Sequence, residues 1–115
     1  METLNDWITA LQSSGKAIII EGPKDKAALE SFGIQTIFLL SEKPLFAVAE
    51  EVAMQFSEVI LLTDLDKKGK ELYGKLSKEF KRLGVKVDIT FREFLQKETK
   101  LSHVEGLTTY VRNNP

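Results

Sequence analysis

The stretch AIIIEGPKD at residues 17–25 decides the fold class of this chain. It joins a short apolar run, mostly β-branched, to a carboxylate at Glu21 and a second one at Asp25. A continuously apolar, β-branched run is typical of a parallel strand that is buried on both faces. The stretch VILLTDLDKKG at residues 59–69 repeats the arrangement, again with two carboxylates after the apolar run. We therefore expect two buried strands that each end in an acidic turn and lead into a helix.

Outside these stretches, short apolar runs alternate with segments of helical periodicity. Strands are expected at residues 17–21, 36–40, 59–62 and 85–89, and helices at 5–13, 23–33, 44–56, 69–83 and 92–97. A looser segment is expected to follow and to end near Val111. The alternation predicts an α/β fold, with a Rossmann-like, four-stranded, mostly parallel sheet and helices on both faces. Residues 1–115 are expected to form a single domain, with its core at about 16–90, an N-terminal helix and a C-terminal helical tail.

Composition excludes several classes of protein. Hydrophobic residues make up 43% of the chain and charged residues 29%, which is ordinary for a globular domain. There is no cysteine, so disulfides, thiolate zinc sites and a thiol nucleophile are excluded, and the one histidine, His103, excludes a multi-histidine metal site within the chain. The acidic N-terminal segment does not resemble a signal peptide, and no apolar run approaches the roughly 18 residues of a membrane span. We expect a cytoplasmic protein without a membrane partner.

Four carboxylates are expected to gather at one edge of the sheet. The carboxyl ends of parallel strands meet at the same edge, which is where open α/β sheets bind ligands. Glu21 and Asp25 follow the first strand, and Asp64 and Asp66 follow the third. Carboxylates held this close repel one another, and a hard divalent cation relieves the repulsion because it prefers oxygen ligands. The sequence therefore predicts a Mg²⁺ site, which Mn²⁺ would also suit, and a raised proton affinity for Glu21 when the metal is absent.

Simpler interpretations of the same residues stay open. Glu21 and Asp25 could be a carboxylate pair that satisfies the free N–H groups at a helix start. Asp64 and Asp66 could form an ordinary loop turn with an N-cap. His103 is interpreted as a surface or packing residue, while Glu105 could reach the acidic edge from the tail.

Charge is unevenly distributed along the chain. Residues 1–63 carry nine Asp and Glu against four Lys, whereas residues 64–86 carry eight Lys and Arg against four Asp and Glu. A basic segment that begins at an acidic turn suits a polyanion lying across a metal. The alternative is a solvated lysine face on a surface helix. The candidate nucleic-acid contacts are the basic residues expected around the acidic edge: Lys24, Lys67, Lys68, Lys70 and Arg92. Arg92 is favoured for phosphate because guanidinium binds it bidentately, although a surface ion pair is equally consistent.

The pattern Glu21-Gly22-x-x-Asp25, combined with Asp64-x-Asp66-x-x-Gly69, resembles a Toprim domain. That metal-binding module is shared by topoisomerases, bacterial-type primases, OLD-family nucleases, recombination mediators and the ribonuclease that matures 5S ribosomal RNA. The resemblance covers about residues 16–90, and the chain is similar in size to small stand-alone Toprim proteins, described as primase-like or maturase-like.

The resemblance implies a role for each matching residue. It makes Glu21 a general acid/base or a metal ligand, Asp64 and Asp66 the pair that holds Mg²⁺, and Asp25 an auxiliary ligand. Two departures bear on function. No region supplies the topoisomerase tyrosine, since Tyr73 and Tyr110 do not match it. The place where primases carry a further acidic cluster reads Asp88-Ile89-Thr90-Phe91-Arg92-Glu93, with Asp88 expected within the strand at 85–89.

Two functions follow from these observations and stay open at this point. The first is a Mg²⁺-dependent, nuclease-like phosphoryl-transfer protein acting on RNA or single-stranded DNA. The second is a non-catalytic, metal-dependent nucleic-acid-binding module, or an accessory subunit that works with a partner protein in a primase or RNA-processing complex. A receiver domain and a haloacid-dehalogenase-type phosphatase are disfavoured, because each places its acidic pair after the first strand, where this chain has Glu21-Gly22. Oligomeric state stays open.

Overall fold

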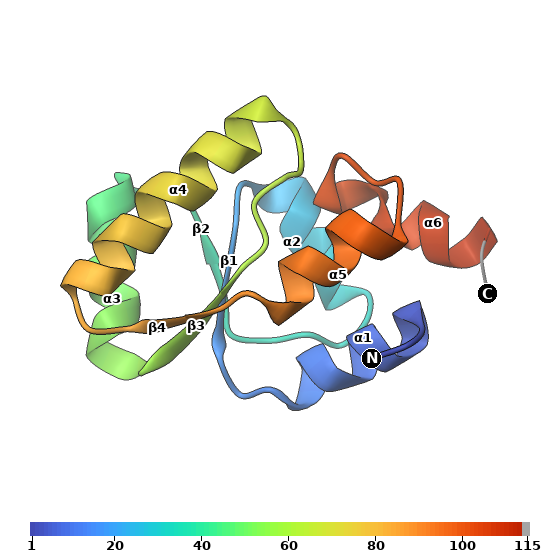
Figure 1. Cartoon of the computed structure of the whole chain (residues 1–115), viewed down its shortest axis with the longest axis horizontal. Helices are drawn as coiled ribbons and strands as arrows, with labels where there is room; N and C mark the ends of the chain where they lie inside the picture. Colours follow the sequence, from blue (N-terminus) through green and yellow to red (C-terminus); the bar gives the residue numbers. More distant parts are fainter. Residues whose placement is uncertain (114–115) are drawn as a thin grey trace.

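The computed structural model describes residues 1–113, and its helices and strands alternate along the chain (Figure 1). In chain order the elements are α1 (Leu4–Ser13), β1 (Ala17–Ile20), α2 (Pro23–Glu30), β2 (Ile37–Leu39), α3 (Leu45–Gln55), β3 (Glu58–Leu61), α4 (Lys67–Arg82), β4 (Lys86–Asp88), α5 (Thr90–Glu98), the 3-10 helix η1 (Val104–Gly106) and α6 (Leu107–Asn113). None of the helices described is long and apolar enough to cross a membrane.

The four strands form one sheet in the order β2-β1-β3-β4, and every pair is parallel. In the register of the sheet, Ile18 lies between Ile37 of β2 and Ile60 of β3. The predicted four-stranded parallel α/β sheet is therefore confirmed. After β1 the chain adds β2 on one side and then returns to add β3 on the other, so β1 and β3 flank the point where strand order reverses. Ligands of open α/β sheets bind at such a point.

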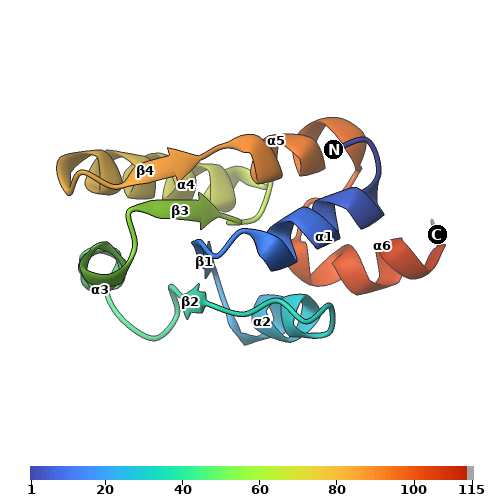
Figure 2. The same ribbon diagram turned by 90° about the horizontal axis from the view of Figure 1, so that it is seen from below.

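Side chains alternate between the two faces of the sheet, and each face has its own hydrophobic core. Ile18, Ile20, Ile60 and Leu62 pack with residues of α1, α2, α5 and the C-terminal segment. The alternate residues of β1 and β3 pack with α3 and α4: Ala17, Ile19, Val59 and Leu61. Figures 1 and 2 show α1, α2, α5 and α6 grouped on one side of the strands and away from α3. Each fully buried Ile contributes about 1.5–3 kcal/mol, so this double burial explains why both runs are continuously apolar.

The C-terminal region differs from the expectation. In place of a looser segment after residue 97, the chain forms η1 and α6, because Val104 and Leu107 are buried in the core that also holds Trp7. The Trp7 indole N–H donates to the carbonyl oxygen of Phe91 (2.9 Å), which ties α1 to α5. Helix α4 begins two residues earlier than expected, at Lys67, because the Asp66 side chain caps it. The C-terminal region is therefore packed onto the same face of the sheet as α1 and α2.

Candidate metal centre at the carboxyl ends of β1 and β3

Glu21 and Asp64 meet directly at the carboxyl ends of neighbouring strands. Glu21 follows β1, Asp64 follows β3 after two more residues, and the Asp64 N–H donates to Oε2 of Glu21 (2.7 Å). Because β1 and β3 are hydrogen-bonded neighbours, this contact joins the two acidic stretches that lie 43 residues apart in the sequence. The expected meeting of Glu21 with the turn that holds Asp64 is present in the structure.

Asp64 is almost fully buried, with 9% of its surface exposed, and its surroundings hold it in place. Its Oδ1 accepts the N–H of Val104 (2.8 Å), and its backbone carbonyl accepts Nη2–H of Arg92 (2.8 Å). Nε–H of Arg92 donates to the carbonyl oxygen of the preceding Thr63 (3.2 Å). The loop that carries Asp64 is therefore fixed from two directions, by the C-terminal segment and by α5.

Asp66 has two separate partners. Its Oδ1 accepts the Gly69 N–H (2.8 Å) and so caps the start of α4. Its Oδ2 lies 3.2 Å from Nε2 of His103. The capping role was one of the two alternatives from the sequence, and the structure shows that it leaves the second carboxylate oxygen facing the C-terminal segment.

Asp25 is buried at the first turn of α2, with 6% of its surface exposed. Its Oδ2 accepts the Gly22 N–H (3.0 Å), which closes the turn after β1. Asp25 also lines the same surface pocket as Glu21 and Asp64, whereas Asp66 is not among the residues that line it. The residues around this pocket come from three separate parts of the chain: Glu21, Gly22, Pro23, Lys24, Asp25, Asp64, His103 and Glu105.

The pKa values of Glu21 and Asp25 are raised, and repulsion between the neighbouring carboxylates, which a bound cation would relieve, contributes to both increases. Burial raises the pKa of Glu21, and repulsion from Asp64, Asp66 and Asp25 adds to the increase, while the hydrogen bond from the Asp64 N–H opposes it. Burial also raises the pKa of Asp25, with further repulsion from Asp64 and Glu105. The raised proton affinity expected for Glu21 is thus present, and its main cause is desolvation, with negative neighbours second.

The basic residues divide into two groups. Lys24, on α2, and three lysines at the start of α4 are exposed to solvent: Lys67, Lys68 and Lys70. Arg92 is different, because it is buried with 6% of its surface exposed, donates to two backbone carbonyls and lies 4.6 Å above the Tyr73 ring. This placement corrects the expectation of an accessible phosphate contact or a surface ion pair. We assign Arg92 to positioning the Asp64 loop.

Two residues of the C-terminal segment lie at the site: His103, which the sequence analysis interpreted as a surface or packing residue, and Glu105, for which it left a place at the acidic edge open. One ligand atom from each of Asp64, Asp66 and His103 lies within 4.8 Å of the others, which makes these three a candidate set of metal ligands. Glu105 lines the pocket beside them. His103 lies 37 residues after Asp66, and no local pattern marks it, so only the packing of the C-terminal segment reveals its position.

Asp88 does not join the acidic group. It ends β4, and its Oδ2 pairs with Nζ of Lys16 (2.8 Å), the residue before β1, while Oδ1 accepts the Thr90 N–H (3.0 Å). The position within a strand that was expected for Asp88 is observed. Asp88 therefore stabilises the start of α5 and forms an ion pair with Lys16.

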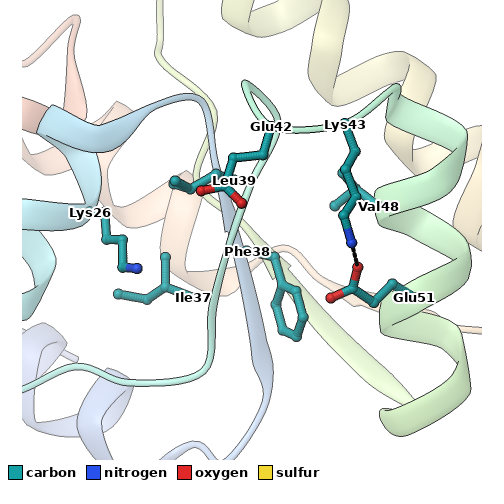
Figure 3. Close-up of a pocket in the computed structure, with 8 residues that line it drawn as sticks. All are labelled: Lys26, Ile37, Phe38, Leu39, Glu42, Lys43, Val48 and Glu51. Atoms are coloured by element: carbon teal, nitrogen blue, oxygen red, sulfur yellow. Dashed lines mark hydrogen bonds and ion pairs between the residues drawn. The ribbon is translucent and has the colours of Figure 1, made fainter.

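A second pocket lies beside the edge strand β2 and is shown in Figure 3. It is lined by Ile37, Phe38 and Leu39 together with charged residues of α2, of α3 and of the loop between β2 and α3, and Lys43 of this loop pairs with Glu51. Its two acidic residues, Glu42 and Glu51, belong to no group of candidate metal ligands among residues 1–113. Among residues 1–113, the candidate metal ligands therefore lie around the carboxyl ends of β1 and β3 and not at this second pocket.

Comparison with known proteins agrees with this arrangement. The family model of the Toprim domain matches residues 16–97, so the chain belongs to the Toprim domain family. Membership indicates a nucleic-acid-related function that uses a divalent metal.

Similar proteins include small archaeal proteins designated UPF0292. One from Methanocaldococcus jannaschii is 33% identical over 105 residues, covering 88% of this chain and 82% of the relative. One from Pyrococcus abyssi is 43% identical over 90 residues, covering 77% and 67%. A solved structure of a protein from Aquifex aeolicus is 34% identical, with a TM-score of 0.85 over 91% of this chain and 98% of that one.

Proposed function

We propose that this protein is a divalent-metal-dependent, nuclease-like phosphoryl-transfer enzyme that acts on RNA or single-stranded DNA with Mg²⁺ or Mn²⁺. The observation that supports this most directly is the contact of Glu21 with the Asp64 N–H (2.7 Å). It puts a carboxyl group of raised pKa beside the Asp64 and Asp66 carboxylates. A proton-transfer group next to a set of metal-binding oxygens is the combination that phosphodiester hydrolysis requires.

The roles of the residues follow from their surroundings. Asp64 and Asp66 hold the ion, and Asp25 supports them from the adjoining turn. A divalent ion bound there would orient the phosphate and stabilise the charge that develops on it. In hydrolysis a water oxygen bonds to phosphorus, the bond to the leaving oxygen breaks, and one proton passes from the water to the leaving group. Glu21 is the group that holds this proton, because its pKa is raised towards the working range of a general acid/base.

Helix α4 offers a surface for the polyanion. It begins at Lys67, directly after Asp66, and its outer face carries a row of exposed basic residues, whereas Leu76 and Phe80 of its inner face are buried. The row is Lys67, Lys68, Lys70, Lys75, Lys78, Lys81 and Arg82. Lys67, Lys68 and Lys70 lie nearest to the site and contact the phosphates next to the scissile one. Lys24 approaches from α2, where it lines the pocket.

The test is a cleavage assay on single- and double-stranded RNA and DNA with Mg²⁺ or Mn²⁺. Glu21→Gln and the double variant Asp64→Asn with Asp66→Asn should each lose cleavage while remaining folded, because Gln and Asn preserve the size of the side chains. Glu50→Gln, an exposed glutamate on α3, is the matched control and should cleave like wild type. Cleavage by the double variant at the wild-type rate would contradict the proposal.

The basic row also supports the second candidate function, a non-catalytic metal-dependent module that binds nucleic acid, alone or as an accessory subunit with a partner protein in a primase or RNA-processing complex. The row extends along a helix of 16 residues, well beyond the acidic pocket. Basic residues far from the pocket can bind phosphates of a nucleic acid that is not cleaved. Salt-dependent binding with no product after long incubation with Mg²⁺ or Mn²⁺ would favour this candidate over the enzyme.

A further inference from the structure

The segment at residues 102–104 is anchored to the acidic loop on both sides of His103. The Leu65 N–H donates to the carbonyl oxygen of Ser102 (2.9 Å), and the Val104 N–H donates to Oδ1 of Asp64 (2.8 Å). The Val104 side chain is buried in the core beneath, which fixes the segment from the other side as well. His103 therefore projects from a backbone that is held on both sides of it.

The imidazole of His103 faces the carboxylates. Its Nε2 lies 3.2 Å from Oδ2 of Asp66, and one ligand atom from each of Asp64, Asp66 and His103 lies within 4.8 Å of the other two. Its Nδ1 lies 3.2 Å from Oγ of Ser102, and ligating histidines commonly have such a partner on the second ring nitrogen. The site thus presents a mixed set of nitrogen and oxygen donors, in place of the all-oxygen set expected from the sequence.

From this geometry we infer that His103 is a third ligand of the ion held by Asp64 and Asp66. The site therefore binds a first-row transition-metal dication, such as Mn²⁺ or Co²⁺, more tightly than Mg²⁺. The inference rests on the metal site of the proposed function. Imidazole nitrogen favours transition-metal ions, whereas Mg²⁺ prefers oxygen ligands and keeps several waters. This ligand comes from the C-terminal segment, outside the residues 16–97 that match the family.

Metal titration of the full chain tests the inference without any assay of activity. After removal of metal with a chelator, CoCl₂ is titrated with visible absorption as the readout, and MgCl₂ is titrated by calorimetry. Wild type should bind Co²⁺ about tenfold or more tightly than Mg²⁺. His103→Ala should weaken Co²⁺ binding by about 10- to 100-fold and change the absorption band, while Mg²⁺ affinity stays close to that of wild type.

Two further variants make the result decisive. His103→Gln offers an amide oxygen, so it should bind Mg²⁺ like wild type and lose the preference for Co²⁺. Lys97→Ala, a basic exposed residue on α5, is the control and should leave both affinities unchanged. The His103 side chain is 53% exposed, so its replacement is expected to leave the fold intact, which circular dichroism verifies.

Several outcomes would overturn the inference. If His103→Ala keeps the Co²⁺ affinity and the absorption spectrum of wild type, the contact of His103 with Asp66 is a surface contact without a role in metal binding. Equal affinity of the wild type for Co²⁺ and Mg²⁺, or binding of neither, would also overturn it. A protein that binds Co²⁺ through His103 yet cleaves no nucleic acid would contradict the proposed enzyme and leave this inference standing.

Discussion

Gly69 lies against the backbone carbonyl of Asp64 so closely that a β-carbon at position 69 would overlap the carbonyl oxygen. The Gly69 N–H donates to Asp66, and its own carbonyl accepts the hydroxyl of Thr63 (2.7 Å). The start of α4 is therefore packed directly onto the loop that carries the candidate metal ligands. The requirement for glycine here is steric, because the overlap is with backbone, which cannot move aside as a side chain can.

We predict that Gly69→Ala is destabilising and disrupts metal binding. Relieving the overlap must displace the Asp64 carbonyl or the start of α4, at a cost of about 1–3 kcal/mol in the free energy of unfolding. Gly74→Ala is the matched control in the same helix, because a β-carbon there meets nothing within 4 Å. It should stabilise the protein by up to about 1 kcal/mol through helix propensity. Urea denaturation measures both, and equal stability of the two variants would contradict the prediction.

The metal-free protein should lose stability as the pH rises towards neutral. The folded state raises the pKa of Glu21 and Asp25 above their ordinary values of 4.5 and 3.8, so it binds their protons more tightly than the unfolded chain does. The free energy of unfolding therefore falls as the pH rises from the ordinary carboxyl range through the raised values. Asp25→Asn removes one of these charges, and its amide oxygen can still accept the Gly22 N–H, although the hydrogen bond with the Glu105 backbone is lost.

In the presence of a chelator, the stability of Asp25→Asn relative to wild type should consequently increase as the pH rises to neutral and decrease again on acidification. Thermal unfolding at a series of pH values measures this, with Glu50→Gln as a control that keeps the wild-type profile. Parallel pH profiles for Asp25→Asn and wild type would show that Asp25 titrates as it does in the unfolded chain.

Adding a divalent ion should relieve the repulsion between the carboxylates and stabilise the folded protein. An ion that binds the folded state alone stabilises it by about 2.7 kcal/mol at a hundredfold excess over its Kd. We expect Mn²⁺ to raise the Tm of wild type at neutral pH. The Tm of the double variant, Asp64→Asn with Asp66→Asn, should not change when Mn²⁺ is added. An equal rise in the double variant would place the bound ion elsewhere.

Arg92→Lys should weaken metal binding although residue 92 is not a ligand. Lysine cannot donate to the carbonyls of Thr63 and Asp64 in the fork geometry of guanidinium, and it loses the stacking on Tyr73. A buried carbonyl left without its donor costs about 1–3 kcal/mol. We expect lower stability and about tenfold weaker metal binding. Wild-type values for both would show that the loop holds its shape without Arg92.

The basic row of α4 should set the salt dependence of nucleic-acid binding. Each phosphate contact on a single strand contributes about 0.7 to the slope of log affinity against log salt concentration. Replacing Lys67, Lys68 and Lys70 by Ala should therefore reduce the slope by about 2. Lys97→Ala is the control. An unchanged slope in the triple variant would move the interface away from the start of α4.

Local patterns predicted the sheet well, because each depends on short-range chemistry. The apolar runs ending at Glu21 and before Asp64 mark strands buried on both faces, and their order in the chain implies that their carboxyl ends meet. The boundary of α4 was less predictable. Because Asp66 is the cap, the helix begins at Lys67, two residues before the expected start at Gly69. The choice between these starts depends on which side chain accepts the free N–H groups.

The sequence alone thus determined the α/β class, the parallel strands and the carboxylates at their ends, since periodicity records which side chains must leave water. Only the tertiary structure decided the partners of those carboxylates. It brought His103 to Asp66 and placed Arg92 beneath the Asp64 loop, across 37 and 28 residues of chain. The physical reason is that burial patterns specify faces, whereas hydrogen-bond partners depend on how whole elements pack, and no local signal carries that information.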